Sequence, residues 1–458
     1  MTDDLLRNAA ERAIRYLDRL DERSVAPQPE AVARLAELGG ELPEAAADPA
    51  AVIELLDRVG SPATVASAGR RYFGFVVGAA LPVTVAANWL AAAWDQNAGV
   101  FVLSPAAAAL ESAARRWILE VLGLPGKAEI GFVSGATMAN LTGLAAARHA
   151  LLERMGWDVE AQGLFGAPPI KVVVGDEVHV SLLKALALLG MGRDRVVRVP
   201  VDGQGRMRAD RLPPLDAASL LCIQAGNVNT GAFDPAPALC DRAHEAAAWV
   251  HVDGAFGLWL AADPPRARLV AGFERADSWA MDAHKWLNVP YDSGLAICRF
   301  PEHLRASMSA AASYIIHGDE RDPYQYSPEL SRRARGVEVW AALRGLGRAG
   351  LAEMLERTCR LAERFARGLK AAGHEVLNDV VANQVLVSFG DPEVTRRVIA
   401  SVQNDGTCWC GGSVWQDHTT MRISVSSWST TDEDVDRSLA AILRCAEQAK
   451  REAGAKGR

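Results

Sequence analysis

The stretch that decides the fold is HVDGAFG at residues 251–257, followed by DSWAMDAHKW at residues 277–286. Asp253 and Lys285 each follow a run of apolar residues that is typical of a buried strand. An ammonium group held at a strand end beside a carboxylate indicates one of two things. It belongs either to a cofactor site or to a structural ion pair at the edge of the sheet.

Pyridoxal phosphate (PLP) catalysis is a chemistry that needs both groups. The lysine amine condenses with the cofactor aldehyde, and the aspartate carboxylate keeps the pyridine nitrogen protonated so that the ring withdraws electrons. The pair Asp253 and Lys285 therefore favours a PLP site, with a buried Lys–Asp ion pair as the alternative.

The composition is that of a large globular protein. The chain has 458 residues, of which 50% are hydrophobic and 23% charged, which is enough for two or three domains. A net charge of −7 without a basic block gives no support for nucleic-acid binding. No apolar run is long enough to span a bilayer, and the charged start MTDDLLRNAAERAIRYLDRL is unlike a signal peptide. Seven cysteines, an odd number, fit reduced thiols. We expect a cytoplasmic protein without nucleic-acid or membrane partners.

Strand and helix patterns alternate from about residue 81 to residue 338. This alternation, with continuous apolar strands, predicts an α/β fold with a mostly parallel sheet covered by helices. In such sheets the ligand-binding residues gather at the carboxyl ends of the strands. The predicted strands are 131–134, 172–175, 196–200, 220–224, 249–253 and 278–282, and the predicted helices are 139–154, 182–189 and 237–248.

The flanking regions have other patterns. The first 80 residues are amphipathic helices that cannot easily form their own core, so we expect them to pack on another domain or on a dimer partner. From residue 337 the pattern predicts two helices separated at Gly350, and then an α+β arrangement. Its predicted elements are helices 337–348, 351–372, 392–404 and 432–447 and strands 384–388 and 421–426. The predicted domains are an N-terminal helical segment (1–80), a large α/β domain (81–338) and a small C-terminal α+β domain (339–458).

Two further motifs lie where predicted strands end. SGATMAN, at residues 134–140, follows a strand and opens a helix, and its glycine turn and exposed amides would attract a phosphate. An ordinary helix cap is the alternative. His179, in DEVHVSLLKA, lies between a strand and a helix, where an imidazole could stack on a pyridine ring. A lone histidine at such a place is more often structural.

Tyr314 lies in a stretch of small residues, AAASY at 310–314, that is typical of a loop. A phenol on a moving loop could deliver a proton inside a closed site, and Tyr324 and Tyr326 are rival candidates. The remaining histidines show neither metal-ligand spacing nor a nucleophile partner, so the sequence predicts no metal site.

With these motifs in their order, the chain resembles the group II PLP-dependent decarboxylases, which have the type I (aspartate aminotransferase-like) fold. That family includes the aromatic amino acid, glutamate and histidine decarboxylases. The likeness runs from RYFGF, at residues 71–75, to the end of the chain, and it is most specific at SGATMANL, DEVHVSLLKA, HVDGAFG and DAHKW. The resemblance implies decarboxylation of an L-amino acid, with aromatic ones among the candidates, to its amine with release of carbon dioxide.

The resemblance also implies roles for residues at matching positions. Lys285 would bind PLP covalently, Asp253 would hold the pyridine nitrogen, and His179 would stack on the ring. Tyr314 would be the mobile-loop tyrosine that returns a proton after carbon dioxide departs. The family forms homodimers whose sites both subunits complete. The further cofactor contacts that the resemblance implies are Ala136, Thr137, Asn227, Ala255 and His284.

Departures from the family pattern leave the substrate open. Asp282 replaces the asparagine usual before the His–Lys pair, and an acidic group near phosphate is unfavourable unless it is turned away or protonated. Asn227 stands where relatives often have threonine. The segments 74–79 and 94–97 differ from those of the aromatic enzymes, and Trp428 lies where the glutamate enzymes have a carboxylate-binding arginine. A PLP-dependent aminotransferase or aldolase, and a catalytically silent PLP-binding protein, are the alternatives.

Overall fold

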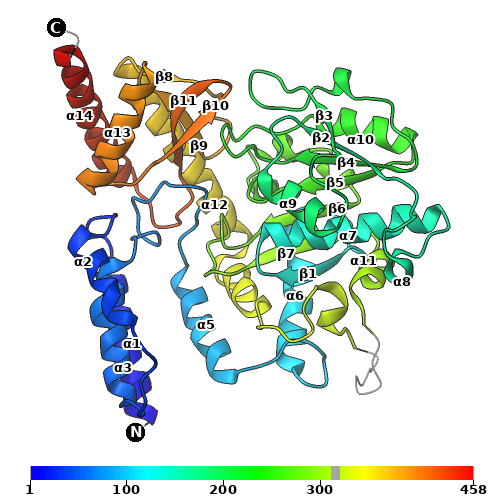
Figure 1. Ribbon diagram of the computed structural model, residues 1–458, viewed down its shortest axis with the longest axis horizontal. Coiled ribbons are helices and arrows are strands. Elements are labelled where there is room, and N and C mark those ends of the chain that lie inside the picture. The colour runs from blue at the N-terminus through cyan, green and yellow to red at the C-terminus, as the bar shows by residue number, and fades with distance from the viewer. Residues whose placement is uncertain (1, 311–319, 457–458) are drawn as a thin grey trace. The chain divides into compact units, whose positions relative to one another are not determined.

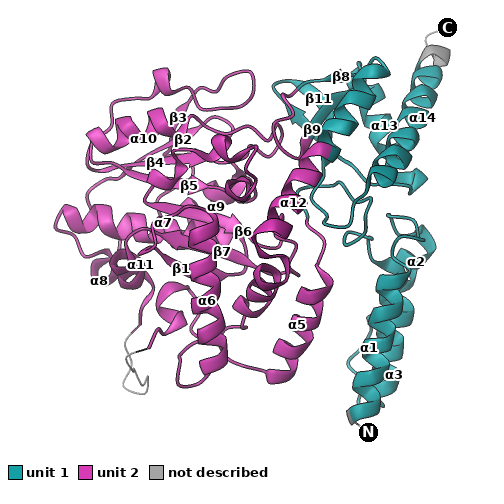
Figure 2. Cartoon of the chain, turned by 180° about the vertical axis from the view of Figure 1, so that it is seen from behind, with its two compact units in different colours: residues 1–77, 361–377, 385–458 teal, residues 78–360, 378–384 magenta. Residues whose placement is uncertain are grey.

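The computed structural model describes residues 2–310 and 320–456. The chain divides into two compact units, which Figure 2 shows in different colours. Unit 1 comprises residues 1–77, 361–377 and 385–458, and unit 2 comprises residues 78–360 and 378–384. The N-terminal segment and most of the C-terminal region thus belong to one unit, whereas the division into three domains stays a prediction.

Unit 2 is built on a seven-stranded sheet of order β1-β7-β6-β5-β4-β2-β3 (Figure 1). Strand β7 is antiparallel to both its neighbours, and the other described strands run in one direction. The predicted mostly parallel α/β sheet is therefore confirmed. The strands are β1 (Glu129–Val133), β2 (Lys171–Gly175), β3 (Val197–Val199), β4 (Ser219–Gln224), β5 (Trp249–Asp253), β6 (Ser278–Asp282) and β7 (Gly294–Cys298).

The predicted strands of this sheet agree with the observed ones to within two residues, but β7 was not predicted. Its sequence GLAIC is apolar enough for a buried strand. A loop of residues 283–293 connects it directly to β6, without the helix that a parallel crossover requires. The alternation of strands and helices therefore gave no reason to expect a strand there.

Helix α7 (Ala136–Arg154) packs against β1, β5, β6 and β7. Small side chains allow its first turn to lie close to the strand ends, since Ala139, Ala280 and Ala296 form a buried cluster there. The other helices of unit 2 are α5 (Pro82–Trp94), α6 (Pro105–Val121), α8 (Val159–Gln162), α9 (Val180–Leu188), α10 (Ala236–Glu245) and α11 (Pro301–Met308), with short 3-10 helices η3 (Ala209–Arg211), η4 (Gly257–Ala262), η5 (Ala267–Val270), η6 (Phe273–Arg275) and η7 (Pro323–Tyr326).

Unit 1 contains a four-stranded sheet of order β10-β11-β9-β8. Its last helix is capped by Thr431, because the Asp434 N–H donates to the Thr431 hydroxyl oxygen and the Thr431 N–H donates to the Asp434 carboxylate. The elements are α1 (Thr2–Asp18), α2 (Pro29–Ala33), η1 (Arg34–Leu38), α3 (Pro49–Leu55), η2 (Leu56–Gly60), α4 (Ser61–Ala63), β8 (Glu375–Val376), β9 (Gln384–Ser388), α13 (Pro392–Asp405), β10 (Gly411–Trp415), β11 (His418–Ser424) and α14 (Asp432–Lys456).

Helix α12 (Gly336–Ala371) contains the break that the sequence predicted, at a different glycine. Gly347 has a φ of 60°, which interrupts the helical backbone, whereas the sequence analysis placed the interruption at Gly350. Either glycine tolerates a left-handed backbone, and the pattern of apolar residues does not distinguish them.

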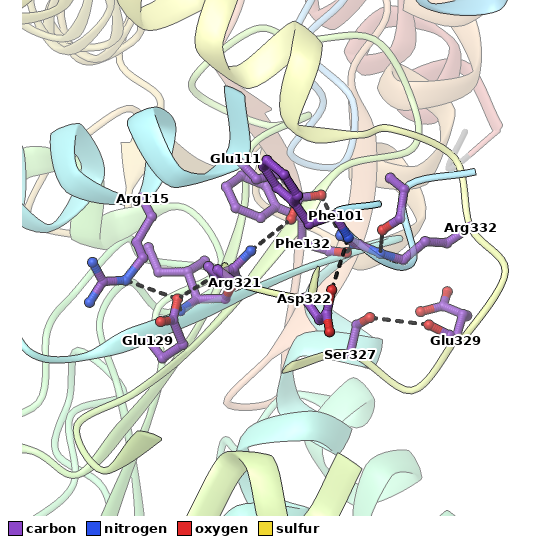
Figure 3. A network of polar contacts seen from close by, with 12 residues as sticks. Phe101, Glu111, Arg115, Glu129, Phe132, Arg321, Asp322, Ser327, Glu329 and Arg332 are labelled. Atoms are coloured by element: carbon purple, nitrogen blue, oxygen red, sulfur yellow. Dashed lines mark hydrogen bonds and ion pairs between the residues drawn. The ribbon is translucent and has the colours of Figure 1, made fainter. Parts of the chain in front are cut away.

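Buried charges tie residues 320–335 to α6 and β1 (Figure 3). Glu111 of α6 is fully buried and uses both carboxylate oxygens. One lies 3.2 Å from Nη1 of Arg321, and the other pairs with Arg332. Arg321 also donates to Glu129 of β1 at 3.1 Å, and Arg332 donates to the Phe132 carbonyl at 2.7 Å. These contacts fix the chain on both sides of η7.

Among residues 2–310 and 320–456, no helix combines the length and the apolar character needed to cross a membrane.

The Glu111 network predicts a large effect of one substitution. Replacing Glu111 by Ala leaves two buried guanidinium groups without their shared carboxylate, and we expect the free energy of unfolding to fall by about 3–5 kcal/mol. Urea unfolding followed by circular dichroism measures the change. Arg193→Ala, which removes a 70% exposed partner of Asp194, is the control and should change stability by about 0–1 kcal/mol. A Glu111→Ala protein as stable as this control would contradict the assignment.

Candidate active site

The carboxyl ends of β5 and β6 place two aspartates at the same edge of the sheet. Asp253 is the last residue of β5 and Asp282 the last residue of β6, and both are buried. Helix α7 begins at this edge too, because it follows the parallel strand β1 after Ser134 and Gly135. The structure thus brings the SGATMAN, HVDGAFG and DAHKW motifs together, as the sequence predicted.

Asp282 binds three groups of the candidate site. Its Oδ1 accepts the N–H of Ala136 at 2.5 Å and lies 3.3 Å from Nε2 of His284. Its Oδ2 lies 3.0 Å from Nζ of Lys285, whose side chain is 20% exposed. Asp282 is therefore not turned away from the site: it occupies the first amide of α7, at the place where the sequence analysis expected a phosphate.

His284 is held as a neutral imidazole with a defined tautomer. Burial lowers the pKa of His284 below its ordinary value, and the nearby Asp282 carboxylate opposes that shift. Its Nδ1 accepts the N–H of Ser293 at 3.1 Å, and its ring stacks on Tyr291 with 4.2 Å between the ring centroids. The remaining proton of the neutral ring is on Nε2, which therefore offers an N–H toward Asp282 and the start of α7.

Two glycines allow the backbone to close around this position. A Cβ atom on Gly135 would lie 3.1 Å from the His284 ring and 3.3 Å from Asp282. A Cβ atom on Gly294 of β7 would lie 2.5 Å from the Cα atom of Gly135, closer than such atoms approach. Because both positions are glycine, the backbone at the start of α7 can lie close to β7 and to the His284 ring.

Asp253 accepts hydrogen bonds at both carboxylate oxygens. Oδ1 accepts the N–H of Ala255 at 3.3 Å, and Oδ2 accepts from the Asn140 side-chain amide at 3.4 Å. These two contacts fix the orientation of the Asp253 carboxylate. Asn140 is one helical turn after Ala136, so the first turn of α7 reaches both Asp282 and Asp253.

His179 is joined to the same network through α9. It is the N-cap of that helix, and its Nδ1 lies 2.7 Å from the Ser181 hydroxyl and accepts the Ser181 N–H at 3.2 Å. The Asn140 amide lies 3.5 Å from the same hydroxyl. His179 therefore has a structural capping role in addition to any contact with a ligand. Lys184, farther along α9, is exposed.

Three other residues were predicted to take part in the site. Thr137 is the second residue of α7 and is half-buried. The Asn227 side chain is buried and donates to Glu177 at 2.9 Å, while its oxygen accepts backbone N–H groups of the loop that follows. Tyr314 lies outside the described residues.

The sequence analysis missed Asn140 and His251 as members of this site. Both lie inside motifs that it singled out, SGATMAN and HVDGAFG. The signal that could have found them is a buried polar residue on an apolar helix face or strand, since such a group needs a hydrogen-bond partner. The sequence does not say which partner that is.

The donor set fits pyridoxal phosphate, with one departure. The amide of Ala136, the Nε2–H of His284 and the glycine-lined turn suit a phosphate at a helix start. Lys285 offers an amine and Asp253 an acceptor for a pyridine N–H. The departure is Asp282, a carboxylate on the amide that a phosphate would use.

A seven-stranded α/β sheet with a lysine and two aspartates at its carboxyl edge defines the class of PLP-dependent enzymes with the type I fold. The family model of the pyridoxal-dependent decarboxylase conserved domain matches residues 41–390. The chain therefore belongs to the pyridoxal-dependent decarboxylase family. It is a PLP-dependent carboxy-lyase that decarboxylates an amino acid.

Curated relatives carry the same chemistry in their names. The chain is 25% identical over 430 residues to an aromatic-L-amino-acid decarboxylase of Bacillus atrophaeus, covering 89% of this chain and 87% of that protein. It is 27% identical over 389 residues to an L-2,4-diaminobutyrate decarboxylase of Rhizobium meliloti (strain 1021), covering 79% and 75%. The crystal structure of Oryza sativa TDC with PLP and tryptamine matches with a TM-score of 0.89 at 22% identity, over 98% of each chain, and supports the fold.

The position of Asp282 predicts a cofactor site weakened by a like charge. We expect Asp282→Asn to bind pyridoxamine 5′-phosphate at least about tenfold more tightly, because two like charges about 4 Å apart cost roughly 1–4 kcal/mol at a partly solvated site. Equilibrium dialysis measures this affinity, and the amine form of the cofactor avoids any covalent step with Lys285. Asp241→Asn, on the exposed face of α10, is the control. Equal or weaker binding by the Asp282 variant would contradict the repulsion.

Proposed function

We propose that Lys285, Asp253, His179 and Tyr314 are the catalytic residues of this decarboxylase. When bound, pyridoxal phosphate supplies the electron sink that accepts the electron pair left by departing carbon dioxide. Lys285 would hold the cofactor through its side-chain amine. The hydrogen-bonded carboxylate of Asp253, which accepts from Asn140 and Ala255, supports its proposed role at the pyridine nitrogen.

The phosphate end of the cofactor is assigned to the start of α7. Ala136 and Thr137 would donate from the first helical turn, and His284 would donate its Nε2–H. His179 would cover one face of the ring, Ala255 would pack beside it, and Asn227 would lie at its edge. The shared sheet edge of β5 and β6 and the links through Asn140 and Asp282 support this assignment.

We assign the proton that completes the amine to Tyr314. The segment that would carry it follows α11, and both of its described ends are held. The Tyr324 hydroxyl donates to the Ala310 carbonyl at 3.3 Å, and Arg321 is bound to Glu111 and Glu129. Because Tyr324 makes that contact and Tyr326 accepts from Arg305 at 2.9 Å, both rival tyrosines have structural partners. This favours Tyr314.

We propose a substrate whose side chain carries a polar group. A cavity of about 710 Å³ lies beside α5 and is lined by Asn88, Asp95, Gln96, Asn97 and Arg333 among others. In the family, the segment that contains Gln96 and Asn97 faces the site of the dimer partner. Carbon dioxide release from each of the twenty amino acids and from common aromatic derivatives identifies the substrate, and exclusive use of apolar amino acids would contradict this choice.

We propose that the chain acts as a cytoplasmic homodimer. Apolar side chains remain exposed on the helices that the family would place at its interface. They are Leu6, Ile14 and Leu17 of α1, Val52 of α3 and Val83, Trp89, Leu90 and Trp94 of α5. Sedimentation at the dilution used for activity tests the assembly, and a fully active monomer would contradict it.

Substitution of Lys285 tests the central assignment. We expect Lys285→Ala to lose the visible absorbance of lysine-bound cofactor and carbon dioxide release, at least about 1000-fold, because no other amine replaces the nucleophile. Borohydride should fix the cofactor to Lys285 in the wild type. Lys184→Ala, an exposed lysine of α9, is the control and should behave as the wild type. Full activity of Lys285→Ala would refute the assignment.

Substitution of Tyr314 tests its assigned role as proton donor. We expect Tyr314→Phe to keep the visible absorbance of the cofactor while its yield of amine falls at least about tenfold, because a positioned proton donor contributes about 10²–10⁴-fold to such a step. Amine, aldehyde and keto acid are measured in parallel with carbon dioxide. Keto acid formed without carbon dioxide would instead indicate the aminotransferase alternative. An undiminished amine yield would remove Tyr314 from the mechanism.

A further inference from the structure

A chain of buried hydrogen bonds runs from the sheet interior to Asp253. Trp249 donates its indole N–H to the Ser278 hydroxyl at 2.9 Å, and that hydroxyl lies 2.8 Å from Nδ1 of His251. Nε2 of His251 lies 2.9 Å from Oδ1 of Asn140, whose amide nitrogen donates to Asp253. The side chains of all five residues are buried, so water does not compete for these groups.

The direction of each hydrogen bond in this chain is determined. Burial lowers the pKa of His251 to about 3, so the ring is neutral at pH 7 and carries one N–H. A carboxylate oxygen accepts hydrogen bonds, so Asn140 turns its NH₂ toward Asp253 and its oxygen toward His251. His251 must then carry its proton on Nε2 and accept at Nδ1. The Ser278 hydroxyl, which already accepts from Trp249, donates there.

We infer that Asn140 and His251 are positioning residues for the cofactor, because together they hold the Asp253 carboxylate correctly turned toward the pyridine nitrogen. This inference rests on the proposed function of Asp253. A histidine of the opposite tautomer would turn the Asn140 oxygen against the Asp253 carboxylate, and acceptor would face acceptor. Asn140 also reaches the Ser181 hydroxyl that binds His179, so one amide orients the groups assigned to the ring nitrogen and the ring face.

Substitution of Asn140 by Leu, which has a similar volume and no polar group, tests this inference. We expect kcat to fall about 10- to 100-fold, as for the loss of one hydrogen bond to a charged group, with KM for the amino acid little changed. The visible absorbance of the bound cofactor should also change its pH profile. Thr142→Val is the control, because Thr142 is buried on the same helix and its hydroxyl bonds only to the Met138 carbonyl of α7 among the contacts described.

A second measurement needs no substitution. Nitrogen NMR of ¹⁵N-histidine-labelled, cofactor-free protein should show His251 neutral with its proton on Nε2 at pH 7. A protonated ring, or the Nδ1–H tautomer, would overturn the inference. A wild type that releases no carbon dioxide would defeat the proposed function instead. If the wild type is active and Asn140→Leu matches Thr142→Val in kcat and absorbance, the inference alone fails.

A separate cluster lies at the far end of α7, where His149 and Glu153 face His303 of α11. Oε2 of Glu153 lies 3.7 Å from Nε2 of His149 and 3.5 Å from Nδ1 of His303. These separations are long for hydrogen bonds and close to those between two ligands of one metal ion, and the three ligand atoms lie within 4.8 Å of one another.

A further carboxylate orients one of these ligands. Nδ1 of His149 lies 2.6 Å from Oε2 of Glu160. With Nδ1–H donating to this carboxylate, the Nε2 lone pair is directed at Glu153 and His303. This carboxylate–histidine arrangement is typical of metal sites. We propose that His149, Glu153 and His303 bind a divalent transition metal such as Zn²⁺. No metal site was predicted from the sequence, because His303 lies about 150 residues along the chain from His149 and Glu153.

Zn²⁺ titration by calorimetry on untagged, full-length protein tests the site. We expect one ion per chain in the wild type, loss of that binding in His303→Ala, and affinity about 10- to 100-fold lower in Glu160→Gln. His244→Ala, an exposed histidine of α10, is the control. Absence of binding in the wild type, or binding that His303→Ala leaves unchanged, would overturn the proposal.

Discussion

The first turn of α7 is the constraint on which the site depends. The Ala136 N–H binds the carboxylate at the end of β6, and the Asn140 amide binds the carboxylate at the end of β5. Four residues of helix rise about 6 Å, so a single rigid turn sets the spacing between the two strand-end carboxylates. The small side chains of Ala139, Ala280 and Ala296 make this approach possible. The packing of alanines thus determines where the polar groups meet.

Two neutral histidines also fix the direction of hydrogen bonds in the site. His251 and His284 are buried, and each has one nitrogen that accepts a hydrogen bond, so each presents an N–H in a defined direction. For His251 that direction is Asn140, and for His284 it is Asp282. Burial keeps these histidines neutral, and a neutral histidine donates from only one of its two ring nitrogens.

The sequence predicted what its periodicity and strand ends determine. The bounds of β5 and β6 agree with the predicted strands, and Asp253, Asp282 and the start of α7 meet at one edge because parallel strands end on the same side. The contacts of His251 could not be predicted from the sequence. That residue reaches the Ser278 hydroxyl because β5 and β6 pair in the register that sets residue 251 beside residue 278. A sequence pattern gives the strands but not the register between them, just as it gave the helix break in α12 without choosing between Gly347 and Gly350.

Asp282 changes how the site attracts an anionic cofactor. The ammonium of Lys285 is balanced by Asp282 at 3.0 Å, Asp253 adds a second negative charge, and His284 is neutral. Before the cofactor binds, these four side chains therefore carry a net charge of about −1, whereas a phosphate monoester brings about −1.5 to −2. Attraction between opposite net charges does not explain binding here. The backbone N–H groups at the start of α7 and the Nε2–H of His284 must supply it, since dipoles directed at a phosphate remain favourable when the surrounding charges are not.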